Sequence, residues 1–458
     1  MEKITQKLAK FAIDLNFSSL PLEVVERVKL LVLDITGITV RARHDAESTP
    51  SMLKALKLLG LNNGPCTVIG DSERYSAPAA ALLNGTLAHS LDFDDTHAEG
   101  SIHSSAPIVP AAIAAAEIAG SSGQELITAI VAGYEIQLRL SMALNPAEHY
   151  KRGFHPTATC GIFGASAAAA KLLGLDASRL ESAFGIALSQ ASGSMQFLND
   201  GAWTKRSHVG QAAQNGLMCA VLAREGFKGP SEAFEGKAGF LNSFSPKPDF
   251  SRATLGLNSE WETMRLAVKP YPSCRYSHAA MDGLIEIRNE YKVNSEQVEE
   301  VLVGLPKVGL NLIGDPISLK QNPKSIVDGQ FSMPFCAAVI LRQGRLEWDD
   351  YSRHLKDTKT LDFCRKVDCY VDSDAERASP QNMSGKVKVK TGEGQYEKFI
   401  NVPLGEPENF LSIDQFVNKF RTLAEPYLGD TIENLTEQLL NLERANDVRS
   451  VINLGRPN

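Results

Sequence analysis

Apolar residues recur at helical spacing through most of the first 265 residues, and short breaks carrying Gly, Pro or Asn separate the segments. One such segment follows Pro21, where Leu22, Val25 and Val28 begin an apolar face. Later segments, among them ASAAAAKLLGL and QAAQNGLMCAVLAREGF, are rich in small residues, which lets helices approach closely. The pattern predicts a large helical domain over residues 1–267.

The pattern changes near Val268, where apolar and polar residues begin to alternate. The alternation predicts strands at 299–306, 366–372, 385–391 and 395–403, with a turn at the sequence GEG between the last two. Helical spacing is interleaved with these strands, first from His278 and again over 332–344. The mixture predicts a smaller α+β domain over residues 268–405.

Helical periodicity returns in the tail, residues 406–458, in the segments IDQFVNKFRTLAEPYL and IENLTEQLLNLE. A helical tail after an α+β insert predicts that the chain returns to pack on its first domain. The expected fold class is therefore mostly α, with an all-helical domain formed by both ends of the chain.

Composition narrows the range of functions. A chain of 458 residues exceeds the size of a single core, and its net charge of -7 argues against a nucleic-acid partner. The seven cysteines lack the paired spacing of a zinc site, so we expect reduced, buried thiols. No signal sequence precedes the first helix, and the longest apolar stretch, 106–120, is broken by Pro and too short to span a bilayer. We expect a cytoplasmic protein without a membrane partner.

Four clusters carry residues suited to chemistry, and the first is DFDDTH at 92–97, followed by His103. Asp and His are ligands for hard or borderline cations, which leaves a metal site as one interpretation. The motif lacks the spacing of the common zinc motifs, and Asp and Thr also cap helices. We therefore favour a site without metal.

The second cluster is RGFHPT at 152–157, where His155 precedes a small-residue helix expected to begin near Ala158. Free N–H groups at a helix start favour a substrate carboxylate, although a buried structural histidine is an equal alternative. The third is DGAWTKRSH at 200–208, ahead of another Ala-rich helix. Lys205 in this segment is either a solvated surface residue or a partly buried cation directed at an anion.

The fourth cluster, VKPYPSCRYSH at 268–278, falls at the predicted domain junction. Two prolines hold this backbone extended, and it presents Lys269, Cys274, Arg275 and His278 within ten residues. Pockets form preferentially at such junctions. The alternative is a rigid linker with incidental polar residues.

Taken together and in this order, the four clusters resemble the MmgE/PrpD family, whose members include 2-methylcitrate dehydratases, cis-aconitate decarboxylases and iminodisuccinate epimerases. The matching segments are LDFDDTHAEGSIHSSAPIVPA, GFHPTATCGIFGASAAAAKLLGL, DGAWTKRSHVGQAAQNG and VKPYPSCRYSHAAMDG. The resemblance runs over essentially the whole chain. It implies an all-helical domain with an inserted α+β lid domain, a homodimer, and no metal or organic cofactor.

The resemblance also assigns the site. It implies His103, His155, Lys205 and Lys269 as catalytic residues, and the substrate-binding residues would be Asp92, Thr96, Cys274, Arg275 and His278. Cys274 stands where the decarboxylase branch has a histidine, which argues against the decarboxylase.

A di- or tricarboxylate substrate requires fixed cations, for which Lys205, Lys269 and Arg275 are the candidates, and a base with a pKa near neutrality, which histidine supplies. The expected function is a dehydratase (hydro-lyase) acting on a hydroxylated polycarboxylate such as 2-methylcitrate, by analogy with the family. An epimerase or racemase of an amino- or iminodicarboxylate, a cis-aconitate-type decarboxylase and a polycarboxylate-binding protein are the alternatives.

Overall fold

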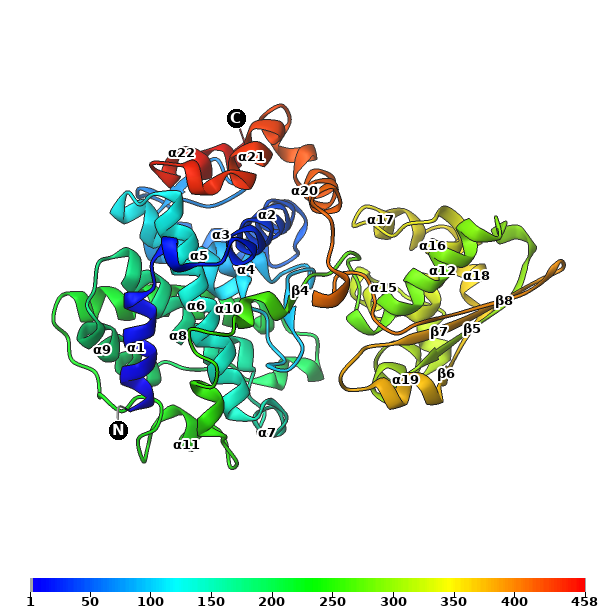
Figure 1. Cartoon of the computed structure of the whole chain (residues 1–458). Coiled ribbons are helices and arrows are strands. Elements are labelled where there is room, and N and C mark those ends of the chain that lie inside the picture. The colour runs from blue at the N-terminus through cyan, green and yellow to red at the C-terminus, as the bar shows by residue number, and fades with distance from the viewer. Residues whose placement is uncertain (1–2, 458) are drawn as a thin grey trace. The chain divides into compact units, whose positions relative to one another are not determined.

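The computed structural model describes residues 3–457 and divides the chain into two compact units (Figure 1). One unit, the helical unit, combines the chain up to Leu266 with the segment from Ser412 onward. The other, the α+β unit, is the intervening segment Ala267–Leu411. The prediction of a mostly α protein is confirmed, because helices dominate and the strands form only small sheets.

The helical unit is a set of packed helices with three two-residue strands among them. Its longer helices are α1 (Ile4–Asp14), α2 (Leu22–Asp45), α3 (Thr49–Leu58), α4 (Ala77–Ala88), α5 (Ser105–Ala119), α6 (Gly123–Leu144), α8 (Pro156–Leu172), α9 (Ala177–Leu188), α10 (Thr204–Arg224), α20 (Ile413–Leu428) and α21 (Thr431–Leu440). Its short elements are α7 (Pro146–Lys151), α11 (Phe240–Phe244), α22 (Val448–Ile452), β1 (Cys66–Thr67), β2 (Arg74–Tyr75) and β3 (Thr96–His97), and β4 (Leu266–Ala267) marks the unit boundary.

Small residues allow the central helices to approach closely. A Cβ added to Gly133 of α6 would lie 2.8 Å from the carbonyl oxygen of Gly164 in α8, and a Cβ on Gly164 would lie 2.6 Å from that of Gly133. Such distances are too short for any side chain, so both glycines are required by the packing. The close contact between α6 and α8 sets the spacing of the residues that hold the candidate site.

The C-terminal helix α20 packs on α2 within the helical unit. Lys419 of α20 lies 2.6 Å from the carboxylate of Asp34 in α2, and a Cβ on Gly37 would lie 2.9 Å from the ring of Phe420. Lys419 also donates a hydrogen bond of 3.2 Å to the carbonyl oxygen of Phe93. The last fifty residues of the chain therefore support the loop that contains DFDDTH.

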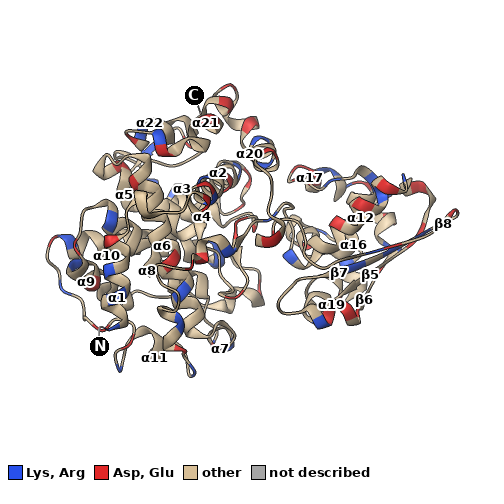
Figure 2. Cartoon of the chain, viewed as in Figure 1, with Lys and Arg blue, Asp and Glu red and all other residues tan. Residues whose placement is uncertain are grey.

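Helix α6 is the one described helix that is long and apolar enough to cross a membrane. All of its apolar window is buried inside the helical unit, as in the core helix of a soluble protein. Lysines, arginines and acidic residues are interspersed along the elements of both units (Figure 2), and among the charged types α8 carries only Lys171.

The α+β unit contains a four-stranded sheet with the order β6-β5-β7-β8. Its strands are β5 (Val298–Leu305), β6 (Val367–Val371), β7 (Gly385–Thr391) and β8 (Gly394–Ile400). Its helices are α12 (His278–Glu290), α13 (Lys307–Gly309), α14 (Ile317–Lys320), α15 (Ile326–Gln330), α16 (Met333–Gln343), α17 (Asp350–His354), α18 (Thr358–Cys364) and α19 (Ser373–Ala378). Strands β5 and β6 are parallel, and the other two pairs are antiparallel.

All four predicted strands are present, within a few residues of their expected bounds. Thr391 pairs with Gly394, so the hairpin between β7 and β8 turns at Gly392 and Glu393. Val387 and Val389 of β7 face the core of the unit, which they share with apolar residues of α12 and α16. The parallel pairing of β5 with β6 and the short helices between them were not predicted.

Candidate active site

The DFDDTH loop begins at the C-terminal end of α4 and ends at the start of α5. His89 terminates α4, and Asp92 adopts a left-handed backbone conformation with φ 53°. Asp95 accepts hydrogen bonds from the backbone N–H groups of Ser104 and Ser105, at 3.2 and 3.1 Å, and so caps α5. Burial, together with the nearby Asp94, raises the pKa of Asp95 to about 6. This aspartate has a structural partner and is not available to a substrate.

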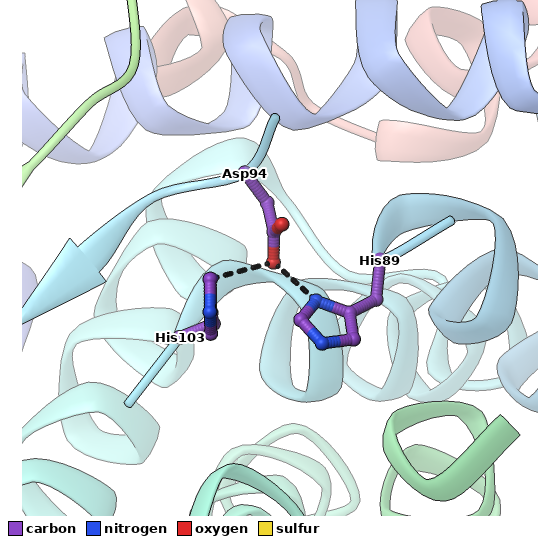
Figure 3. Close-up of side chains that lie close together, drawn as sticks. All are labelled: His89, Asp94 and His103. Carbon is purple, nitrogen blue, oxygen red and sulfur yellow. Dashed lines mark hydrogen bonds and ion pairs between the residues drawn. The ribbon is translucent and has the colours of Figure 1, made fainter. Parts of the chain in front are cut away.

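Asp94 lies between two histidines (Figure 3). Its Oδ2 is 2.8 Å from Nδ1 of His89, which donates to it, and 3.2 Å from Nδ1 of His103, which is close but not aligned for a hydrogen bond. Burial opposes ionisation of Asp94, but His103 and His89 outweigh burial and hold its pKa well below the ordinary value. Asp94 is therefore a buried carboxylate that stays charged beside His103.

Hydrogen bonds from two core helices fix the backbone of His103. Gln137 of α6 donates to the carbonyl oxygen of His103 at 3.0 Å and to that of Thr157 in α8 at 3.1 Å. The hydroxyl of Thr157 accepts from the N–H of His103 at 3.3 Å. The side chain of His103 remains 15% exposed, whereas those of His89 and Asp94 are fully buried. A rigid backbone with an accessible ring is the arrangement that a catalytic base requires.

Four imidazole rings lie next to one another in this region. The centroid of His89 is 4.7 Å from that of His103 and 5.9 Å from that of His155, and His155 is 5.8 Å from His208. Burial lowers the pKa of His89 to about 4, and burial with the neighbouring His89 and Lys205 lowers that of His155 well below its ordinary value. Both rings are therefore neutral at pH 7. Nδ1 of His155 is buried without a hydrogen-bond partner among the described residues.

Lys205 pairs with the first aspartate of the loop. Its Nζ donates to Oδ1 of Asp92 at 2.9 Å, and its side chain is 29% exposed. Burial opposes the charge of Lys205, but Asp92 outweighs burial and raises the pKa of the ammonium. Helix α10 begins at Thr204, earlier than the sequence indicated, so Lys205 and His208 lie in its first turns. The structure thus brings Asp92 and Lys205 together, and the carboxylate of Asp92 already balances the charge of the Lys205 ammonium.

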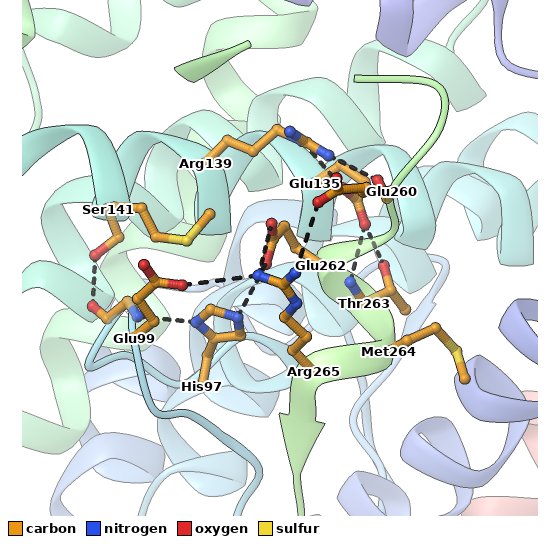
Figure 4. A network of polar contacts seen from close by, with 12 residues as sticks. His97, Glu99, Glu135, Arg139, Ser141, Glu260, Glu262, Thr263, Met264 and Arg265 are labelled. Atoms are coloured by element: carbon orange, nitrogen blue, oxygen red, sulfur yellow. Dashed lines mark hydrogen bonds and ion pairs between the residues drawn. The ribbon is translucent and has the colours of Figure 1, made fainter. Parts of the chain in front are cut away.

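A polar network supports the turn between Thr96 and His103 (Figure 4). Thr96 and His97 form β3, and Nδ1 of His97 accepts from the N–H of Gly100 at 2.9 Å. The hydroxyl of Ser141 in α6 donates to the carbonyl oxygen of Gly100 at 2.7 Å. Nε2 of His97 lies 3.4 Å from Oε2 of Glu262, and Arg265 pairs with the same carboxylate. These contacts anchor the turn to α6 and to the segment that contains Glu262.

The residues predicted from the fourth cluster belong to the α+β unit and are described within it. Lys269 and Cys274 are buried, and the N–H of Cys274 donates to the carbonyl oxygen of Gln330 at 2.9 Å. Arg275 forms a two-nitrogen ion pair with Glu406. His278 begins α12 and is buried against Tyr271. The guanidinium of Arg275 therefore already has a carboxylate partner inside its own unit.

Sequence reasoning missed two residues that contact His103, namely His89 and Asp94. His89 lies three residues before the quoted DFDDTH motif, and Asp94 was inside the motif but indistinguishable from its two neighbours. One signal was available in the sequence. A histidine at the end of an apolar helix can pair with an aspartate five residues later, as His89 does with Asp94. The separate roles of Asp92, Asp94 and Asp95 follow only from the folded loop.

These contacts place the rings of His89 and His103 and the buried carboxylate of Asp94 close together in the helical unit. In comparison with known proteins, residues 6–253 match the MmgE/PrpD N-terminal domain and residues 271–443 match the MmgE/PrpD C-terminal domain. The chain belongs to the MmgE/PrpD family.

Three relatives span nearly the same length. The chain is 28% identical to a cis-aconitate decarboxylase-like protein of Aspergillus oryzae, over 98% of this chain and 97% of that protein. It is 26% identical to the cis-aconitate decarboxylase of Aspergillus terreus, over 98% of this chain and 95% of that enzyme. It is also 26% identical to the cis-aconitate decarboxylase of Homo sapiens, over 98% of this chain and 93% of that enzyme. The family and these relatives support a lyase-type enzyme.

Proposed function

We propose that this protein is a cofactor-independent hydro-lyase that removes a proton α to a carboxylate of a small hydroxylated polycarboxylate, with 2-methylcitrate as the model substrate. The observation that carries the proposal is His103, held by two core helices with the charged carboxylate of Asp94 at 3.2 Å from its Nδ1. An imidazole beside a buried carboxylate is stabilised as imidazolium, and its other nitrogen can accept a proton.

In this mechanism His103 takes the α-proton on Nε2, and Asp94 stabilises the resulting positive charge. The ammonium of Lys205, which pairs with Asp92, also binds a substrate carboxylate. On the family resemblance alone, Lys269 is proposed as a second cation, with Asp92, Thr96, Cys274, Arg275 and His278 as the remaining binding residues. The homodimer is proposed on the family resemblance alone, and the cytoplasmic location is proposed from the sequence.

His155 is proposed as the acid that protonates the departing hydroxyl. Without a ligand its pKa is well below the ordinary value, because the ring is buried beside His89 and Lys205. A substrate with two or three carboxylates adds negative charge to this region, which raises the pKa of a neighbouring imidazole. Substrate binding therefore moves His155 towards the protonated form that an acid needs.

Decarboxylation of a cis-aconitate-type acid is the second candidate, and the named activities of the relatives favour it. That reaction needs no initial base: loss of carbon dioxide leaves a carbanion, which the protonated form of His103 would then protonate. Exchange at a stereocentre, as in an epimerase, needs acid–base groups on both faces of one carbon. A protein that only binds polycarboxylates would need cations but no base beside a buried carboxylate.

Proton NMR in deuterated water distinguishes these reactions when the purified protein is given citrate, 2-methylcitrate, cis-aconitate and aspartate-derived dicarboxylates separately. Alkene signals that grow from a hydroxy acid are the expected result. Carbon dioxide release with a new decarboxylated alkene from cis-aconitate would replace the hydro-lyase with the decarboxylase. Loss of an α-proton signal without a new product would instead establish the epimerase.

A further inference from the structure

Three potential metal ligands meet in the DFDDTH loop: one nitrogen from His89, one from His103 and one carboxylate oxygen from Asp94 (Figure 3). One ligand atom from each residue lies within 4.8 Å of the other two. The three side chains come from the end of α4 and from the loop before α5, and hydrogen bonds already fix the backbone of His103. This is a set of two imidazoles and one carboxylate converging on one small volume.

The spacing is close to that of a zinc site. Zinc binds histidine nitrogen and carboxylate oxygen at about 2.0–2.2 Å with tetrahedral angles, which places neighbouring ligand atoms about 3.4 Å apart. Oδ2 of Asp94 is 2.8 Å from Nδ1 of His89 and 3.2 Å from Nδ1 of His103. Each of these two pairs therefore needs to separate by less than an ångström to admit an ion.

The chemistry of the atoms also fits. Nδ1 of His103 and Oδ1 of Asp94 are buried and have no hydrogen-bond partner among residues 3–457. Nδ1 of His89 carries the ring proton now, and binding would move that proton to Nε2, so the ring neither gains nor loses a proton. Imidazole selects zinc, copper or nickel, whereas magnesium prefers all-oxygen ligands.

We propose that His89, Asp94 and His103 bind one divalent transition-metal ion of the zinc class, and that this ion inhibits the enzyme. An ion on Nδ1 of His103 would hold that ring in place and shift its proton to Nε2, the nitrogen that takes the α-proton in the proposed mechanism. The proton-accepting role of His103 would then be lost. The inhibitory part rests on the proposed function, whereas the binding part does not. Turnover itself needs no ion, so protein treated with a chelator keeps full activity.

Binding is measured first, without any substrate. Metal-free protein is titrated with Zn²⁺ against a chromophoric chelator, and one ion per chain is expected to bind. His89→Ala and His103→Ala should each weaken this binding at least tenfold. The matched control is His354→Ala, because His354 hydrogen-bonds Thr360 and Gln343 within the α+β unit and takes no part in this cluster. Circular dichroism checks that the variants fold, and visible absorption of bound Co²⁺ reports the coordination directly.

Inhibition is measured second, on the substrate found by NMR. One equivalent of Zn²⁺ should abolish turnover, EDTA should restore it, and millimolar Mg²⁺ should have no effect. Equal Zn²⁺ affinity in wild-type and His103→Ala protein would overturn the site while leaving the lyase proposal untouched. Zn²⁺ that binds at this site without slowing turnover would overturn the inhibition. Turnover that appears only with metal would overturn both the inhibition and the cofactor-free mechanism.

Discussion

Replacing Asp94 with asparagine tests the centre of the proposed mechanism. Asparagine has nearly the same shape and can still accept the hydrogen bond from Nδ1 of His89, but it carries no charge. At 3.2 Å from Nδ1 of His103, the carboxylate stabilises an imidazolium by about 5 kcal/mol at an effective dielectric constant of about 20. The amide dipole recovers part of this energy, so we expect a loss of roughly 3–4 kcal/mol, or about 10²–10³ in kcat.

The assay is steady-state turnover of the substrate identified by NMR, with kcat and KM determined separately. KM should change little, because Asp94 is fully buried and pairs with histidines rather than with the substrate. Asp95→Asn is the matched control from the adjacent position, since Asp95 caps α5 and should affect stability more than kcat. A folded Asp94→Asn protein with kcat within threefold of wild type would refute the assignment of Asp94.

Three further substitutions probe other parts of the molecule. His103→Asn should abolish turnover while leaving the fold and ligand binding intact by circular dichroism and calorimetry, and near-normal activity would remove His103 from the mechanism. Lys205→Gln should raise KM at least tenfold, whereas Lys171→Gln should not, because Nζ of Lys171 bonds the carbonyl oxygens of Ile13 and Leu15; equal KM values would exclude Lys205 from substrate binding. Burial lowers the pKa of His149 in the folded protein. The unfolded state therefore binds more protons below pH 6.5, and the free energy of unfolding falls as the pH drops, by at most about 1.4 kcal/mol per pH unit. Urea unfolding at pH 7.5 and 5.5 should show a smaller pH effect in His149→Gln, and an unchanged effect would contradict this role.

Periodicity was enough to predict most of the fold. The helices after Pro21 and at Met333, and the hairpin of β7 and β8, were all expected, because apolar spacing alone distinguishes these elements. The parallel pairing of β5 with β6 was not, since it joins residues more than sixty positions apart and leaves no local signal. Short helices such as α13 and α14 have too few residues to show a period.

The site was predictable only in part. The motifs and the family resemblance they carry pointed to His103, His155 and Lys205, and the structure pairs Lys205 with the predicted Asp92. The motifs did not identify Gln137, which lies in the middle of an apolar helix yet holds the backbone of His103 through one amide group. Whether a polar residue in a core helix is structural or supports a catalytic group depends on what faces it from other helices.

The contact between Lys419 and Phe93 has a consequence for synthesis on the ribosome. The two residues are 326 positions apart, so the DFDDTH loop emerges long before the helix that supports it. At about 5–20 residues per second, roughly 15–65 s separate these two events. During that interval the face of α2 that α20 will cover is exposed, and Asp34 has not yet paired with Lys419. A nascent chain therefore presents an unfinished apolar surface to chaperones and proteases until α20 has been translated.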